Sequence, residues 1–223
     1  MNAVWPVPPW LGPALVAAWL SLLAWLAKLM QQRWPDQPEW SRKLVHIGSG
    51  PVVLIAWFCG IERWVALPVA GVVTLLAALN HRLRLLPGIE DIDRQSYGTV
   101  GYGASITLLF WLLWPDRAQA MAAGVLVMAF GDGLAGLVGP LVASPRWQVW
   151  GQTRSLVGTA VMGGASAAVL LLVAALQPAT APPLWSLLVL AGVATALEQW
   201  ATAGVDNLTV PLAVAGLWLW WGA

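Results

Sequence analysis

The stretch Ala118–Val142, AQAMAAGVLVMAFGDGLAGLVGPLV, decides the fold, because it is a long apolar run with a single charged residue, Asp132. A helix needs about 20 mostly apolar residues to cross the hydrocarbon core of a bilayer, and this run is long enough. The whole chain has the same character: 59% of its 223 residues are apolar, 9% are charged and the mean hydropathy is +0.73. Soluble domains carry about a quarter charged residues. The composition therefore predicts an integral membrane protein and excludes a soluble domain, a disordered chain and a basic nucleic-acid-binding surface.

Apolar runs on both sides of this stretch predict an all-α bundle of about seven or eight membrane-spanning helices in a single domain. The expected spans are Pro9–Met30, Leu44–Cys59, Trp64–Leu79, Val100–Trp114, Ala118–Val142, Leu156–Leu176, Leu184–Leu197 and Leu208–Trp221. We interpret the first span as a retained anchor and not as a cleaved signal peptide, because basic residues follow it and none precedes it. Residues 1–40 are thus expected to form an anchor helix and loop.

The basic residues predict an orientation. Nine of the eleven fall after expected spans one, three and five: Lys28, Arg33, Arg42, Lys43, Arg82, Arg84, Arg94, Arg146 and Arg154. Because basic loops remain in the cytoplasm, we expect both termini on the non-cytoplasmic side of a bacterial plasma membrane or a thylakoid-type membrane. Most of the 17 tryptophans, Trp34 and Trp40 among them, flank span ends, so we assign them to an interfacial belt and not to a ligand. Cys59 is the only cysteine, which excludes an internal disulfide.

Asp132 is the residue that apolar burial does not explain. A charged residue at the centre of a membrane helix costs about 2.5–3.5 kcal/mol on insertion scales and usually marks a functional site. The alternative is a carboxylate that is paired with a basic neighbour. Gly131 and Gly133 leave a bare surface beside it, which suits either the approach of a ligand or close packing of another helix.

A second polar group opens expected span two. On a helix, the spacing of Arg42, Lys43 and His46 places the three side chains on one face, where they suit a phosphate. The alternative for the two cations is an anchor to lipid headgroups, whereas His46 lies within the apolar run and needs a partner.

Two more polar groups are expected at the same face of the membrane. Arg154 and Ser155 open expected span six, where a helix N-terminus suits phosphate oxygens and where Ser155 equally suits an ordinary N-cap. Glu198 and Asp206 are the only charged residues after Arg154. They are either solvated or they neutralise a cation such as a metal ion. Cations, hydroxyls and carboxylates together are the groups that hold magnesium-bound nucleotide phosphates, although neither nucleotide-loop spacing is present.

Five motifs occur in a recognisable order: Arg42-Lys43-x-x-His46, Tyr97-Gly98-Thr99, Gly131-Asp132-Gly133-Leu134-Ala135-x-x-Val138-Gly139, Arg154-Ser155-x-x-Gly158-Thr159 and Asp206-Asn207-Leu208-Thr209-Val210-Pro211. Over residues 41–211 they resemble the phytol kinase and dolichol kinase family of polytopic membrane proteins. The chain departs from the family in having Arg154 where Lys is common, and Gly136 and Pro140 where an acid and a basic residue often stand.

The resemblance implies a kinase that transfers the terminal phosphate of CTP to phytol, or to a geranylgeraniol, farnesol or dolichol type of alcohol, at the cytoplasmic face. It implies catalytic roles for Asp132 and His46, Mg²⁺ ligation by Asp132, Glu198 and Asp206, and nucleotide contacts from Arg42, Lys43, Arg154, Ser155, Gly131 and Gly133. The expected partners are the lipid membrane, the isoprenoid alcohol and the triphosphate, and no nucleic acid. Two alternatives remain: a cytidylyltransferase that forms a CDP-lipid, and a small proton-coupled transporter that uses Asp132 and His46.

Overall fold

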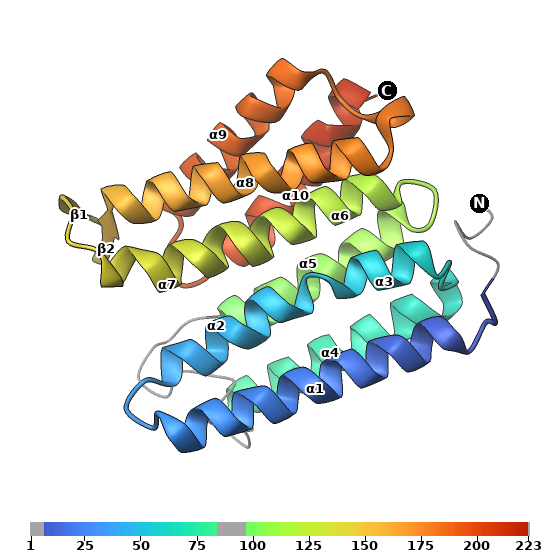
Figure 1. Cartoon of the computed structure of the whole chain (residues 1–223), viewed down its shortest axis with the longest axis horizontal. Coiled ribbons are helices and arrows are strands. Elements are labelled where there is room, and N and C mark those ends of the chain that lie inside the picture. Colours follow the sequence, from blue (N-terminus) through green and yellow to red (C-terminus); the bar gives the residue numbers. More distant parts are fainter. Residues whose placement is uncertain (1–6, 84–96, 223) are drawn as a thin grey trace.

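The computed structural model describes residues 7–83 and 97–222, and these residues form helices and one short hairpin (Figure 1). The α-helices are α1 (Leu11–Arg33), α2 (Pro38–Ser49), α3 (Val52–Phe58), α4 (Arg63–Leu83), α5 (Gly98–Leu113), α6 (Ala118–Leu126), α7 (Gly133–Leu141), α8 (Leu156–Leu176), α9 (Leu184–Trp200) and α10 (Asp206–Gly222). A π-helical segment, η1 (Val127–Asp132), joins α6 to α7, and a 3-10 turn, η2 (Pro178–Thr180), precedes α9. Strands β1 (Arg146–Val149) and β2 (Gln152–Ser155) pair antiparallel. The prediction of an all-α fold is confirmed.

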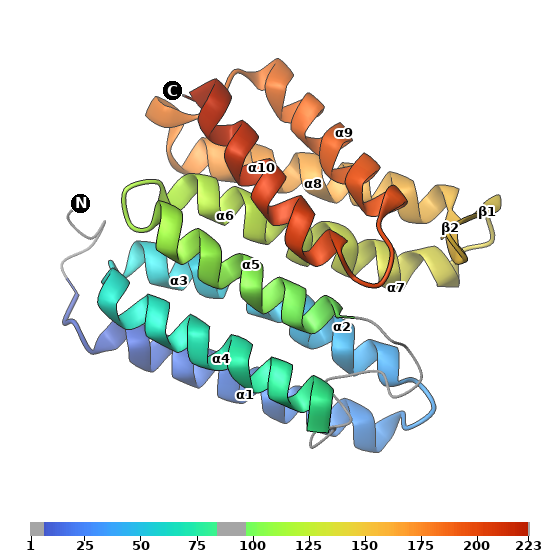
Figure 2. The same cartoon turned by 180° about the vertical axis from the view of Figure 1, so that it is seen from behind.

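The helices run up and down in one bundle, as both views show (Figures 1 and 2). Helices α2 and α3 together make one passage through the bundle, and so do α6, η1 and α7, so that the passages follow the expected spans in order. Of the described helices, α1, α4, α6 with α7, and α8 are long and apolar enough to cross a membrane. The number of crossings stays a prediction.

Three of the connections between helices lie together at one end of the bundle. The α1–α2 turn, the β1–β2 hairpin and the α9–α10 turn lie at this end, which we call the hairpin end (Figure 1). The starts of α1 and α4 and the C-terminus lie at the opposite end. Of the nine basic residues that were expected on one face, seven belong to elements at the hairpin end, and Arg84 and Arg94 fall outside the described residues.

Two passages are interrupted. Helix α2 stops before Pro51, which has no N–H with which to continue the helical bonding, and Gly50 N instead donates to Ile47 O at 3.2 Å. A new helix, α3, then begins with the Pro51 carbonyl accepting from Ile55 N at 3.1 Å. The second interruption is η1, a wider turn that ends at Asp132. Such π-helical turns often occur at functional sites.

The opening stretch of the sequence forms the centre of the bundle. Every residue from Ala118 to Ala129 is buried, and α6 packs against α3, α5, α8 and α10. Helices α1 and α4, in contrast, leave most of their apolar side chains exposed, Leu75 and Leu76 for example. An apolar outer surface of this extent is typical of contact with lipid. Because the passage is buried on all sides up to Ala129, the position of Asp132, three residues further on, is set by the surrounding helices.

Candidate active site

Three carboxylates from distant parts of the chain meet near the hairpin end. Asp132 ends η1, Glu198 lies in the last turn of α9 and Asp206 is the first residue of α10. One ligand oxygen from each lies within 4.8 Å of the others, and the side chains of Glu198 and Asp206 are buried. Because like charges at this separation repel, the cluster requires cations beside it.

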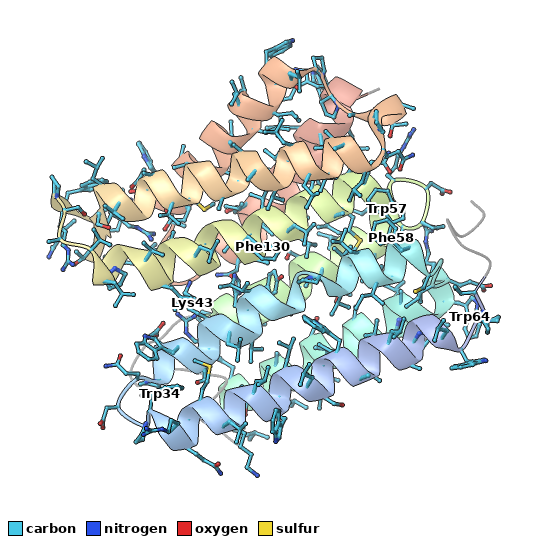
Figure 3. The ribbon with its side chains drawn as sticks, in the orientation of Figure 1. Trp34, Lys43, Trp57, Phe58, Trp64 and Phe130 are labelled. Carbon is cyan, nitrogen blue, oxygen red and sulfur yellow. The ribbon has the colours of Figure 1, made fainter. Side chains whose placement is uncertain are left out.

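Lys43 supplies one of these cations. Its Nζ donates to Asp132 Oδ2 at 2.7 Å and to the Asp132 backbone carbonyl at 3.2 Å. Figure 3 shows Lys43 on the side of α2 that faces α7. Gly136 provides the space, since a Cβ at this position would lie 2.5 Å from Lys43 Cε and 2.7 Å from Nζ. The pairing of Asp132 with a basic neighbour, which the sequence left as an alternative, is thus present within a cluster of acids.

His46 lies one turn further along α2 and contacts the same carboxylate. Its Nε2 is 3.4 Å from Asp132 Oδ2 and 3.2 Å from the Met128 carbonyl oxygen, and its ring lies 4.6 Å from that of Tyr102. His46 is not among the described residues that line the cavity below. We therefore interpret it as a residue that orients Asp132 from behind.

Arg154 supplies the second cation. It forms an ion pair with the Glu198 carboxylate, and its Nη2 donates to the carbonyls of Glu198 at 2.7 Å and Ala201 at 3.0 Å. One guanidinium thereby donates both to the carboxylate and to the carbonyls at the end of α9, which a Lys side chain with its compact ammonium would do less completely. Gln199 Nε2 donates to Glu198 Oε2 at 2.8 Å, and the backbone N–H of Asn207 donates to Asp206 Oδ1 at 3.0 Å.

A cavity of about 580 Å³ lies in front of the carboxylates. This volume is within the range of about 300–1,000 Å³ that is usual for small-molecule sites. The charged residues along its wall are Glu39, Arg42, Lys43, Asp132, Arg146, Arg154, Glu198 and Asp206. Bare backbone at Gly136, Gly139 and Gly158, together with Leu137 and Leu141 of α7, forms much of the remaining wall. The cavity therefore combines a cluster of acids, several cations and an apolar side.

The remaining expected residues fall into two groups. Arg42 and Ser155 line the cavity, where Arg42 Nη2 donates to Glu39 at 2.6 Å and Ser155 Oγ accepts from Gly158 N at 3.1 Å as the N-cap of α8. Gly131 and Gly133 do not line it. A Cβ at Gly131 would lie 2.6 Å from Met162 Sδ, and one at Gly133 would lie 2.2 Å from Ile47 Cγ1. The geometry of these two glycines supports close helix packing, and their expected phosphate contact stays a prediction.

Several residues that line or support the site were not among the expected site residues. Gly136 makes room for Lys43, Gln199 and Asn207 hold two of the carboxylates, and Arg146 extends the row of cations. Asn207 and Gln199 adjoin acids that the sequence did single out, and that adjacency is the signal that could have found them. The Tyr97-Gly98-Thr99 motif starts α5 beside His81 and does not border the cavity.

Comparison with known proteins gives one informative relative. A protein from Synechocystis sp. (strain ATCC 27184 / PCC 6803 / Kazusa) that is named phytol kinase is 41% identical over 226 aligned residues, which cover 97% of this chain and 96% of that protein. No protein-family model and no solved structure matches the chain.

Proposed function

Because the chain belongs to the phytol kinase family and is a kinase with an alcohol acceptor, we propose that it transfers the terminal phosphate of CTP to phytol or a related isoprenoid alcohol. The observation that carries this proposal is the cluster of Asp132, Glu198 and Asp206, whose ligand oxygens lie within 4.8 Å of one another beside Lys43 and Arg154. Phosphoryl transfer depends mainly on alignment and on offsetting negative charge, and the cavity provides groups for both.

The donor set fits a magnesium ion. Mg²⁺ prefers oxygen ligands and is commonly held by one or two carboxylates together with substrate phosphates, so three convergent carboxylates at a cavity wall suit it. Asp132, Glu198 and Asp206 would hold the ion, which when bound would offset charge on the transferring phosphoryl group. Lys43 and Arg154 would balance the carboxylates before the nucleotide enters.

In this reaction the protein is expected to position the reactants and to offset charge, without forming a covalent bond to either substrate. The alcohol oxygen forms a bond to the terminal phosphorus, the bond from that phosphorus to the CDP oxygen breaks, and the hydroxyl loses its proton. Asp132 is our candidate to orient the hydroxyl and receive that proton, because His46 and Lys43 fix its carboxylate. Arg42, which like Lys43 borders the cavity, would contact the phosphates.

The arrangement also suits a lipid substrate. Seven of the described basic residues lie in elements at the hairpin end, so this end is proposed to face the cytoplasm, where CTP is available. Leu137 and Leu141 provide an apolar wall beside the carboxylates. The hydroxyl would reach the cluster while the isoprenoid tail remains among the helices and lipid.

A labelling experiment separates this proposal from its alternatives. Purified protein in lipid nanodiscs is incubated with phytol and with CTP that carries ³²P at either the γ or the α position. We expect γ-label, and no α-label, in the lipid product, and loss of transfer when EDTA removes the metal. In a parallel incubation with a phosphorylated lipid such as phosphatidate, label from the α position would instead indicate a cytidylyltransferase. Transfer of neither label to either lipid would favour a transporter. Geranylgeraniol, farnesol and undecaprenol, tested with each of the four triphosphates, would define the preferred substrates.

A further inference from the structure

Trp40 lines the cavity, although a tryptophan that only anchors a helix at the membrane interface needs no contact with a cavity. It is half-buried in α2 and lines the cavity that holds the three carboxylates. Within the described part of the chain, it is the only aromatic side chain in that wall. Trp200, at the same end of the bundle, is 74% exposed and does not line the cavity, as is usual for a belt residue. Trp40 therefore differs from its neighbours in the belt.

The location of Trp40 relative to Lys43 is fixed by the helix. Trp40 precedes Lys43 by three residues in α2, and a helix rises 1.5 Å per residue, so the two side chains leave the helix about 4.5 Å apart along its axis. Lys43 contacts Asp132, and Trp40 lies one turn nearer the hairpin end. The cavity wall thus passes from carboxylates to an ammonium and then to an indole ring.

The indole is also held in place from outside. The ring of Trp34 meets it edge-on, with the two ring centroids 5.8 Å apart and the planes at 61°. Arg33 lies 5.9 Å from the centroid of the Trp34 ring. Because edge-to-face pairs of this kind stabilise a defined orientation, Trp40 offers a positioned flat surface and not a freely rotating side chain.

We propose that Trp40 is the surface on which the nucleobase of the phosphate donor stacks. This inference rests on the proposed function, because it takes the phosphates of the donor to lie at Lys43 and the carboxylates. The base of a nucleotide is flat and aromatic and stacks on an indole, an interaction that tolerates any base. Gln37 also lines the cavity three residues before Trp40, and its amide offers a donor and an acceptor for the edge of the base.

The test measures nucleotide binding without turnover. Equilibrium dialysis with α-labelled CTP, in the absence of alcohol, gives the Kd of the full-length protein in nanodiscs. Trp40→Ala is expected to raise the Kd for CTP by about 5- to 150-fold, which is the range that loss of one stacked base implies. Trp40→Phe keeps a ring and should retain most of the affinity. Trp200→Ala, which removes an exposed tryptophan at the same end, serves as the matched control and should leave the Kd unchanged.

Inorganic tripolyphosphate provides the decisive comparison, because it has the phosphates of CTP and no base. Its Kd, measured by displacement of CTP, should be the same in the wild type and in Trp40→Ala. An equal loss of tripolyphosphate and CTP affinity, or an unchanged Kd for CTP in Trp40→Ala, would overturn the assignment. Failure of the proposed kinase function would appear differently, as wild-type protein that binds CTP but transfers no γ-label to alcohol.

Discussion

The Asp132 carboxylate lies next to two other carboxylates and next to an ammonium group, and its role in the reaction depends on both. Glu198 and Asp206 bring negative charge to within 4.8 Å of it, whereas Lys43 donates to its carboxylate at 2.7 Å. A single substitution separates its charge from its shape. Asp132→Asn keeps the volume and removes the negative charge, while the amide oxygen and the backbone carbonyl of residue 132, at 3.2 Å, can both still accept from Lys43.

We expect Asp132→Asn to lower the rate of phytol phosphorylation by about 10²- to 10⁴-fold, the usual contribution of a positioned acid–base group, while the protein still inserts into membranes. The measurement is γ-label transfer per amount of protein in isolated membranes. Asp116→Asn is the matched control, because Asp116 is exposed in the loop that precedes α6 at the opposite end, and it should retain full activity. A normal rate in Asp132→Asn would remove this residue from the proposed chemistry.

Gly136→Ala tests whether the position of Lys43 matters. The added Cβ would lie 2.5 Å from Lys43 Cε, and the flexible end of that side chain can shift away at little cost in stability. We expect kcat/KM to fall roughly tenfold, a loss of about 1.4 kcal/mol, because the ammonium is displaced from Asp132. The melting temperature should change little, since Ala favours a helix over Gly by up to about 1 kcal/mol.

Gly71→Ala is the control for this substitution, because a Cβ at Gly71 in α4 would meet no atom within 4 Å. Its activity should equal that of the wild type. If Gly136→Ala were as active as Gly71→Ala, the contact between Lys43 and Asp132 would have no part in the rate.

The carboxylates of the candidate site were predictable, but their pairings were not. Asp132 stood out because a carboxylate within an apolar span is costly. Glu198 stood out because, with Asp206, it is the only charged residue after Arg154, and the structure brings it together with Asp132. That Lys43 contacts Asp132 could not be read from one sequence, because 89 positions separate them and only the packing of α2 on α7 joins them. The space left by Gly136 is equally a property of two helices and not of one.

At the scale of the elements, one close contact between helix backbones lies near the start of the helix that carries an acid. Helix α6 meets α10 where Gly124 faces Pro211, and a Cβ at Gly124 would lie 2.3 Å from the Pro211 carbonyl oxygen. Backbone atoms cannot shift as a side-chain end can. Because Asp206 begins α10, the packing at Gly124 also determines where this carboxylate lies.

We therefore expect Gly124→Ala to destabilise the protein by about 1–3 kcal/mol, as overpacking of a core usually does, and to lower activity as well. Gly216→Ala, in α10 but with no atom within 4 Å of its Cβ, should leave stability unchanged or slightly raised. Thermal unfolding in detergent, followed by the loss of CTP binding, compares the two variants. Equal stability of both would show that α6 and α10 can separate without cost.

The hydropathy pattern predicted which segments form helices more accurately than it predicted where those helices begin and end. The expected span Leu156–Leu176 coincides with α8, because Ser155 caps its start. Helix α2, in contrast, begins at Pro38 and not at Leu44, since its first turns are polar and are held by contacts with α1 and α7. The β1–β2 hairpin was not predicted. Its turn residues, Trp150 and Gly151, both have positive φ, as a tight two-residue hairpin turn requires, but Trp-Gly is not one of the dipeptides that usually signal such a turn.

At the scale of the whole molecule, charge asymmetry and the site coincide. Seven of the described basic residues, the acid cluster and the cavity belong to the hairpin end, whereas Arg63 and Arg117 lie at the other end. If positive charge determines orientation, the nucleotide cavity and the positively charged face must open to the same compartment. The orientation of the bundle is therefore a direct test of whether CTP can reach the site.

Cysteine labelling in intact cells measures this orientation. In a Cys59→Ser background, which removes the single native thiol, Asp116→Cys and Gln148→Cys place one thiol in an exposed position at each end. A membrane-impermeant maleimide should label Asp116→Cys in intact cells and Gln148→Cys only after permeabilisation. Both variants should keep wild-type kinase activity, since neither position lines the cavity. The reverse labelling pattern would place the carboxylates on the side without CTP, and the proposed donor would then be wrong even if the kinase activity stood.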